Sequence, residues 1–512
     1  MLTSNLRRAA GTAAVLLAMG ACMDLEVENP NEPDRDRALA KPADVEALIS
    51  GQFRTFWLLQ QGRAPGPAMD ALAEVEANSS ANYGFEDQST MPATPIINQV
   101  AYSWGYWIQD PFLLQNRGLA AIRDGLQAVE ERNLKISDGP RLQAFAKLMQ
   151  GLFHGNIALQ YDQGFIVDET VEDAGVLELQ PYAEVMAAAR RNLAEARAIA
   201  SQTPFTLPVG WMGPASMSSA VFIRLSHSYE ARLMAQVART PAERAAVDWA
   251  AVLTHVQQGV TEDFGVELDG PGGVWQADYK ERDDLNNSVH LALLGPADQS
   301  GAYRAWENTT PRDRQPFLID TDDRRITGGD PQAPGKYTVY RNYTPNQVEK
   351  GTWRLSNYAR QRYKAIGNTG FGFAPELTVQ EMNLLAAEAH IRLKNPAAAL
   401  PLINATRVAN GGLPPATLEG ATGARCAPRA IGPFAKASTV PEGGCGDLWL
   451  TLIHESRMEK AFLSQGSVYY DARGFGTLRT GKAIHAPVPM EDLQLLGIPH
   501  YTFGGGGPGS AQ

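Results

Sequence analysis

A glycine-bearing stretch near the C-terminus has the spacing of a phosphate-binding loop. Residues Gly476 to Lys482 match the pattern in which two glycines and a lysine cradle the phosphates of a nucleotide. The next residue is Ala483, so the hydroxyl group that would hold magnesium is missing, and Pro487 would cut short a following helix. The sequence therefore does not predict a nucleotide site here.

A second stretch begins like the zinc-binding helix of a metalloprotease. His454 and Glu455 start that pattern, but Met458 occupies the position of the second histidine, so this helix would supply one zinc ligand instead of two. Glu455 and Glu459 share one face of the predicted helix, whereas a glycosidase needs two carboxylates that face each other across a cleft. We interpret these charges as structural or solvated, and we predict no metal site, no cofactor and no catalytic residue.

Two pairs of adjacent acids could bind calcium through their carboxylate oxygens. The pairs are Asp283-Asp284 and Asp322-Asp323. Neither lies in a loop with regularly spaced oxygen ligands, and acidic side chains usually face water. We therefore do not predict a calcium site from them.

Aromatic residues near polar side chains form the remaining pattern that could bind a ligand. Sugars present apolar C–H faces bordered by hydroxyl groups, so a sugar site needs exposed flat rings with Asn, Asp or Arg nearby. Two parts of the chain meet this requirement, and their candidate residues are Tyr83 and Trp104 in the first and Trp275, Tyr279, Tyr303, Arg304, Trp306 and Asn308 in the second. The alternative is that these rings belong to the core.

The composition excludes several classes of protein. Of the 512 residues, 44% are hydrophobic and 20% are charged, which fits a folded soluble body and not a disordered chain or a multi-span membrane protein. The 45 basic and 56 acidic residues give a net charge of −11, so the chain lacks the positive field that attracts nucleic acid. We expect no nucleic-acid partner.

The N-terminus predicts export and a lipid anchor. Arg7 and Arg8 precede an uncharged stretch that is too short to span a bilayer, which is typical of a signal peptide over residues 1–21. The segment Leu17 to Cys22 resembles the lipobox of bacterial lipoproteins, in which the cysteine is acylated and anchors the chain to a membrane. The alternative is an ordinary secreted protein with a free Cys22. Residues 22–40, rich in charge and proline, are then the anchor and tether.

Helical periodicity dominates the body of the chain, residues 41–512, which we interpret as one domain. Apolar residues recur at steps of three and four over 42–60, 112–132, 140–161, 181–201, 214–238, 242–261, 375–394, 396–410 and 446–465. Short turns such as Thr240-Pro241 and Asn395-Pro396 separate neighbouring helices. The pattern predicts a mainly α fold in which antiparallel helix pairs stack in a tetratricopeptide-like solenoid. Gly151 and Gly155 either permit close helix approach or weaken their helix.

Residues 264–375 differ from the rest of the body in composition and periodicity. Glycine, proline, aromatic and polar residues crowd together, and no long helical face can be drawn, so we predict a long irregular, loop-rich segment. The segment keeps large aromatic residues such as Trp275, Trp306 and Trp353. We therefore expect it to be packed or functional, and to form the ligand side of the domain.

Two cysteines bracket a segment rich in glycine, proline and alanine. Export permits oxidation, and if Cys22 carries lipid, Cys426 and Cys445 are the remaining pair, so we predict a disulfide between them. The alternative is two buried, reduced thiols.

Several stretches occur in the order found in a known family. They are Ala144-Phe145 through Leu159 to Gly164, Ala387 to Ala389 with Asn404 and Arg407, Glu455 to Phe462, Tyr469 to Arg473, and Pro487 to Pro489 followed by Glu491 to Leu493. Over most of residues 22–500 the chain thus resembles the SusD/RagB family of outer-membrane nutrient-binding lipoproteins. It departs from the family pattern by two extra residues between Phe462 and Asp471, by Val468 in place of arginine, and by Pro401, which we expect to interrupt a helix that is normally continuous. We interpret the chain as a divergent branch.

The resemblance implies a SusD-like fold, an outer-membrane location facing the cell exterior and a SusC-like TonB-dependent transporter as partner. It also implies that the two aromatic regions build the ligand site, which favours Trp104, Trp275, Tyr303 and Trp306. We therefore expect a protein that binds oligosaccharides and is not an enzyme. The alternatives are a receptor for non-sugar nutrients such as peptides and a glycoside hydrolase on a helical scaffold.

Overall fold

The structure is a computed structural model that describes residues 39–62, 64–78, 84–172, 175, 177–281, 287–343 and 355–511. The predicted signal peptide, Cys22 and nearly all of the predicted tether lie outside these residues, as do Tyr83 and Asp283-Asp284. No helix in the described ranges is long and apolar enough to cross a membrane.

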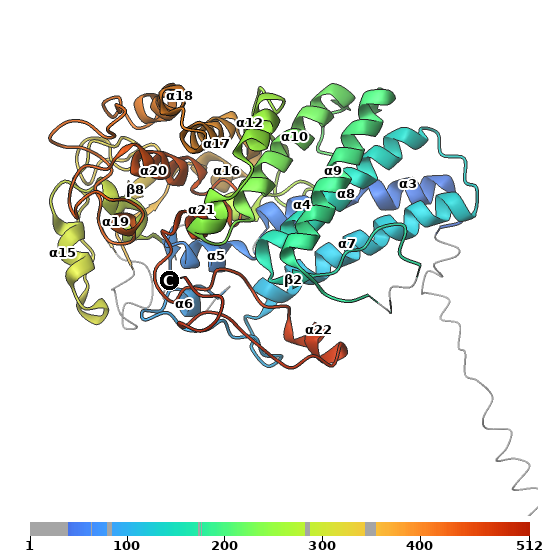
Figure 1. The fold of residues 1–512 in the computed structure, drawn as a ribbon, viewed down its shortest axis with the longest axis horizontal. Coiled ribbons are helices and arrows are strands. Elements are labelled where there is room, and N and C mark those ends of the chain that lie inside the picture. Colours follow the sequence, from blue (N-terminus) through green and yellow to red (C-terminus); the bar gives the residue numbers. More distant parts are fainter. Residues whose placement is uncertain are drawn as a thin grey trace, which may run out of the picture.

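Helices lie side by side across the width of the molecule (Figure 1). They are α3 (Pro42–Ser50), α4 (Gln52–Gln61), α7 (Tyr106–Glu131), α8 (Gly139–Gln160), α9 (Tyr182–Gln202), α10 (Ser219–Gln236), α12 (Trp249–Gln257), α17 (Val379–Arg392), α18 (Pro396–Ala409) and α20 (Leu448–Lys460). Contacts run from α7 to α8, α9, α10, α12, α17 and α18 in turn. The prediction of a mainly α fold built from stacked helix pairs is confirmed.

Short polar side chains define where several of these helices begin. The side chain of Asp138 accepts a hydrogen bond from the Arg141 amide at the start of α8, and Asp447 does the same at the start of α20. Thr378 caps α17 by accepting from the amide of Glu381. Each cap pairs an amide that has no partner within its helix, so local sequence sets these boundaries.

Two glycines of α8 allow its neighbours to approach closely. A Cβ atom at Gly151 would lie 2.7 Å from the Leu193 side chain of α9 and 3.0 Å from the Ala189 carbonyl oxygen. A Cβ atom at Gly155 would lie 2.6 Å from the Leu233 side chain of α10. The interpretation of these glycines as sites of close helix approach is therefore correct.

Several element boundaries differ from the expected ones. The predicted helix over 42–60 is two helices separated at Gly51, and the one over 242–261 is α11 (Pro241–Ala245) followed by α12, which Asp248 caps. Helix α7 begins at Tyr106, earlier than expected. Pro401 does not interrupt α18, because the residue lies on an exposed face, where water can pair the carbonyl group that loses its donor.

Short strands and short helices make up much of the remaining described fold. The described strands form five antiparallel pairs: β1 (Glu76–Ala77) with β7 (Ser288–Val289), β2 (Gln163–Gly164) with β3 (Gln180–Pro181), β4 (Thr206–Leu207) with β5 (Met217–Ser218), β6 (Phe264–Asp269) with β10 (Phe371–Leu377), and β8 (Thr338–Tyr340) with β9 (Tyr358–Arg360). The short helices are α5 (Gly66–Leu72), α6 (Phe85–Gln88), α13 (Asp278–Glu281), α14 (Leu291–Leu294), η4 (Gly295–Ala297), α15 (Ala302–Asn308), η5 (Pro311–Asp313), α16 (Lys364–Thr369), α19 (Pro433–Lys436), α21 (Ser467–Phe475) and α22 (Met490–Leu495).

A buried ion cluster joins the irregular segment to α20. The Arg325 guanidinium contacts the carboxylates of Asp323, Glu455 and Glu459 at 2.7, 2.6 and 3.1 Å, and all four side chains are buried. Arg407 of α18 and Arg362 approach the same carboxylates at 3.6 Å, so three cations face three anions. The charges of Glu455 and Glu459 are therefore structural and not solvated.

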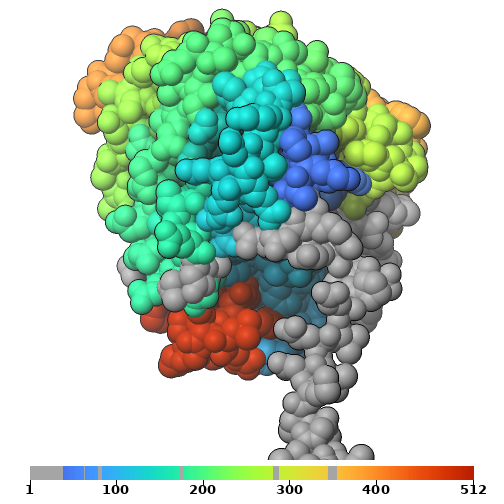
Figure 2. Space-filling view, turned by 90° about the vertical axis from the view of Figure 1, so that its right-hand side faces the viewer, coloured from blue at the N-terminus to red at the C-terminus, as the bar shows by residue number. Residues whose placement is uncertain are grey.

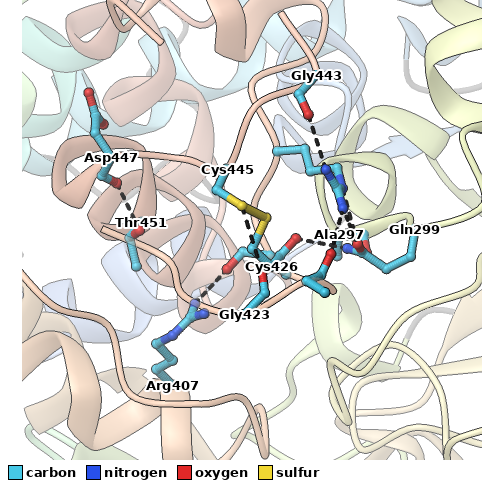
Figure 3. The surroundings of a disulfide bond; sticks show 12 residues. Ala297, Gln299, Arg407, Gly423, Cys426, Gly443, Cys445, Asp447 and Thr451 are labelled. Carbon is cyan, nitrogen blue, oxygen red and sulfur yellow. Dashed lines mark hydrogen bonds between the residues drawn. A yellow bond between two sulfur atoms is a disulfide. The ribbon is translucent and has the colours of Figure 1, made fainter. Parts of the chain in front are cut away.

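A disulfide connects Cys426 to Cys445 across the loop between α18 and α20 (Figure 3). Their Cα atoms lie 5.7 Å apart. The carbonyl of Cys426 accepts a hydrogen bond from the Gln299 side chain at 2.8 Å, and the neighbouring Ala427 carbonyl accepts one from Arg407 at 2.7 Å. The bridge thus lies where the loop contacts both α18 and the irregular segment.

We predict that Gly151→Val destabilises the protein. The added methyl groups must displace Leu193 or push α8 away from α9, and such overpacking lowers the free energy of unfolding by about 1–3 kcal/mol. Urea unfolding measures this change. Gly139→Ala is the matched control, because no atom lies within 4 Å of the added Cβ. Equal unfolding midpoints for Gly151→Val and the parent chain would contradict the close-packing argument.

Candidate functional site

The structure places four of the predicted ligand-binding rings in the core. Trp275, Tyr279, Tyr303 and Trp306 are exposed by only 5%, 2%, 0% and 4%. A ring with both faces covered cannot stack on a sugar. The expectation that these residues contact a ligand is therefore corrected, and the alternative that they are core residues holds for them.

Three neighbouring side chains pack against the ring of Trp306. The Tyr303 ring is stacked beside it, with centroids 5.9 Å apart and an angle of 22° between the planes. The Arg314 guanidinium carbon lies 3.9 Å from the Trp306 ring centroid, and the His290 ring meets it edge-on at 6.0 Å. This aromatic cluster joins α15, which carries Tyr303 and Trp306, to His290 at the start of α14.

An arginine bridges two carboxylates beside the aromatic cluster. Arg479 donates to Glu74 at 2.7 Å and to Glu307 at 2.9 Å, and the Tyr303 hydroxyl donates to Glu307 at 2.8 Å. Burial by itself would raise the pKa of Glu74, but the adjacent Arg479 charge and its hydrogen bond outweigh that effect and lower this pKa to about 2. Glu74 is therefore ionised at neutral pH and helps to hold α15 in place.

The other predicted residues lie nearer to solvent. Arg304 and Asn308 are exposed on α15, and Arg304 lies 3.6 Å from Glu442. Trp104 is half-buried in the loop before α7, and its ring meets that of Tyr106 edge-on with centroids 6.0 Å apart. Of the predicted rings in the described ranges, Trp104 is thus the one that retains an accessible surface.

Polar groups accompany Trp104, and we call the group of Asp87, Tyr102, Trp104 and Tyr106 the Trp104 surface. The Tyr102 hydroxyl donates a hydrogen bond to the Asp87 carboxylate. Burial and the Asp87 charge raise the pKa of Tyr102, so its hydroxyl keeps its proton. Half-buried rings with a carboxylate at hand have the chemistry that a sugar requires: a flat apolar face next to hydrogen-bonding groups.

The C-terminal segment holds this loop in position. The amide of Ile96 donates to the Phe503 carbonyl at 2.8 Å, and Asn98 accepts from the Met490 amide at 2.9 Å and donates to the Val488 carbonyl at 3.0 Å. Figure 2 shows the C-terminal segment, in red, at the molecular surface near the lower edge of the view. Segments almost 400 residues apart in sequence therefore build one surface.

Two exposed rings were not among the candidates from the sequence. Phe371 and Phe373 of β10 are 58% and 41% exposed. They are two residues apart on a strand and so project from the same face of the β6–β10 pair. The alternation of Phe371 and Phe373 with glycine was a possible signal, but the surrounding segment gives no strand pattern strong enough to place them.

The described residues contain no group of three or more His, Cys, Asp and Glu side chains that could hold a metal ion. Asp323 is bound to Arg325 and His454, and Asp322 lies 3.1 Å from Arg425. Arginines therefore occupy the oxygens that calcium would need from this pair.

Comparisons with solved structures identify the fold. A SusD-like protein from Bacteroides fragilis is 12% identical, with a TM-score of 0.53 over 86% of this chain and 88% of its own. A SusD homolog from Bacteroides thetaiotaomicron is 12% identical, with a TM-score of 0.52 over 91% and 97%. One from Bacteroides ovatus is 11% identical, with a TM-score of 0.52 over 88% and 92%. No protein-family model and no curated protein matches the sequence.

The chain therefore has the SusD fold, and the likeness extends over most of its length. The resemblance in the order of short motifs is confirmed at the level of the fold. At 11–12% identity to these structures, the particular ligand does not follow from the comparison.

We predict effects of different size on stability for the loss of two tryptophans. Trp306→Ala removes a buried ring and should lower the free energy of unfolding by about 3–5 kcal/mol. Trp104→Ala removes a half-buried surface ring and should change it much less. Chemical denaturation followed by circular dichroism measures both. Equal stability of Trp306→Ala and the parent chain would place Trp306 on the surface after all.

We predict that Glu74 contributes to acid sensitivity. Its pKa is about 2 in the folded chain against 4.5 ordinarily, so its stabilising effect is complete above about pH 4.5 and is lost as the pH falls towards 2. Glu74→Gln should lower stability at neutral pH and flatten the loss of stability between pH 4.5 and 2. Urea unfolding across this range measures the slope, with Glu131→Gln as control, because Glu131 is exposed at the C-terminal end of α7. A slope unchanged by Glu74→Gln would contradict the assignment.

Proposed function

We propose that the protein is a divergent member of the SusD/RagB family, a surface-exposed lipoprotein that binds oligosaccharide nutrients and delivers them to a SusC-like TonB-dependent transporter. The observation that carries this proposal is the SusD fold, which extends over 86–91% of the chain in the solved structures compared above. The motif order in the sequence supports the same family independently of the fold.

The arrangement of the acidic residues favours binding over catalysis. A glycosidase needs two carboxylates that are free to face a sugar across a cleft. Glu455 and Glu459, which share a helix face, are instead buried around Arg325 at 2.6 and 3.1 Å. These acids are therefore unsuitable as a catalytic pair.

The Trp104 surface is the proposed site of sugar contact. It keeps an accessible tryptophan beside tyrosine rings and a carboxylate, whereas the other predicted rings are buried. Arg304 and Asn308 stay candidates for hydrogen bonds to ligand hydroxyl groups, because α15 presents them to solvent. The Phe371 and Phe373 rings form a second exposed apolar face.

The anchor and the partner belong to the same proposal. Cys22 would carry the lipid, and residues 23–40 would tether the domain to the outer membrane. The described helices include none that could cross a membrane, which is compatible with attachment through lipid.

An array of glycans and peptides tests the proposed ligand class. We expect the purified protein to bind oligosaccharides, and Trp104→Ala to weaken that binding by about 1–3 kcal/mol through loss of ring contact. Phe371→Ala is the matched control, because it removes another exposed ring from a different element. Titration calorimetry gives the affinities, and circular dichroism verifies folding.

The other results would redirect the proposal. Binding of peptides alone would indicate a non-sugar receptor. Release of shorter saccharides would indicate a hydrolase. A loss caused by Phe371→Ala and not by Trp104→Ala would move the sugar site to β10.

A further inference from the structure

A cavity of about 590 Å³ opens where several distant segments meet. It lies between the turn from α10 to α11, the C-terminal end of α17, α19, the first turn of α20, the C-terminal end of α21 and residues 509–511. Its volume falls within the range of small-molecule sites, about 300–1,000 Å³. The cavity is separate from the residues of the Trp104 surface.

Positive charge gathers on the wall of this cavity. Arg239, Arg392, Lys436 and Arg473 line it, and no Asp or Glu is among its lining residues in the described part of the chain. The chain as a whole carries a net charge of −11. The local charge of this wall, with four cations and no anion, is therefore opposite in sign to the net charge of the protein.

Two of these arginines are buried without a carboxylate partner. Arg239 donates to the carbonyls of Ala158 and Tyr161 at 2.8 and 2.7 Å, and Arg473 donates to the Ile484 carbonyl at 2.8 Å. Neither forms an ion pair with a described residue. Burial and repulsion from Arg473 lower the pKa of Arg239 to about 9, so Arg239 is still charged at neutral pH. Unpaired buried charges of one sign are costly, and a bound anion would offset that cost.

The other two cations can reach a ligand directly. Arg392 has a carboxylate contact with Glu388 at 3.5 Å, but Arg244 already holds Glu388 through two hydrogen bonds of 2.7 and 3.0 Å. Lys436 is exposed, and its ammonium group contacts the Thr480 hydroxyl at 3.0 Å. Both side chains therefore have donors available for a new acceptor.

An apolar wall completes the cavity. The rings of Trp449 and Phe475 meet edge-to-face with centroids 5.5 Å apart, and both residues line the cavity. The Arg392 guanidinium carbon lies 4.4 Å from the Trp449 ring centroid, which holds the cation beside the apolar surface. The cavity thus offers cations and aromatic carbon within the same small volume.

We propose that this cavity binds an acidic saccharide, with Arg392 and Lys436 contacting a carboxylate or sulfate group on the sugar and the half-buried Trp449 contacting the sugar ring, while the buried Phe475 holds Trp449 in place. Arg239 and Arg473, which also line the cavity, supply positive potential without leaving their carbonyl partners. This inference rests on the proposed function for the saccharide class, and it adds a second site that selects for negative charge.

Titration calorimetry with three probes tests the charge requirement. The probes are a galacturonic acid trisaccharide, the same trisaccharide with its carboxylates methyl-esterified, and a sulfated disaccharide; inorganic sulfate is measured separately. We expect the acidic trisaccharide to bind at least about tenfold more tightly than its ester, because charge-assisted hydrogen bonds are lost in the ester. The sulfated disaccharide separates sulfate recognition from carboxylate recognition.

Variants locate the site. The double variant Arg392→Gln with Lys436→Gln should weaken binding of the acidic trisaccharide at least about tenfold, and Arg392→Lys should retain most of it. The matched control is Arg117→Gln with Lys135→Gln, which removes two exposed cations from α7 and the turn after it and should leave binding unchanged. Thermal unfolding confirms that every variant is folded.

Four results would overturn this inference. They are equal affinity for the acid and its ester, acidic binding that survives the double variant, an equal loss in the matched control, and inorganic sulfate binding as tightly as the saccharides. Binding of neutral glycans that depends on Trp104 but not on Arg392 and Lys436 would leave the proposed function in place and remove only this second site. Absence of binding to any saccharide would reject both.

Discussion

Pairing of buried charge is the constraint on which this structure depends most. Arg325, which lies in the irregular segment, contacts Glu455 and Glu459 of α20 within 3.1 Å, and Arg407 of α18 approaches Glu455 as well. The loss of one member would leave an uncompensated charge in the core, which costs far more than an intact group contributes. The cluster therefore requires the irregular segment to be docked on the helices whenever the chain is folded.

The same logic recurs where other helices meet. Arg232 of α10 is bound to Glu376 and Glu381, and Arg244 of α11 is bound to Glu388 of α17 at 2.7 Å. Apolar burial is non-directional, whereas a bidentate arginine–carboxylate pair has one satisfactory geometry. Close approach at Gly151 and buried ion pairs together define how the helices of the stack are placed.

The need to bury apolar rings and to pair buried charges also explains where ligands can be bound. In the irregular half, large rings such as Trp306 provide the apolar burial that short strands and helices cannot, so they are unavailable to a ligand. The surface that remains for recognition is made by loops held from a distance, as Asn98 is by the C-terminal segment. The cationic cavity has the same origin. Glu388, the acid near the cavity residue Arg392, is already bound by Arg244.

The sequence by itself determined the helical architecture, because hydrophobic periodicity is a local property of the chain. The order of its short motifs indicated the SusD-like fold. The sequence also indicated the pairing of Cys426 with Cys445, because export permits oxidation and a lipid on Cys22 leaves these two as the remaining pair. Only the tertiary structure decided that Trp306 is buried while Trp104 keeps an accessible surface. The residues that flank a tryptophan look the same whether its ring lies in the core or at a ligand surface. The distinction arises from segments remote in sequence, which cover the Trp306 ring and leave the Trp104 ring partly open.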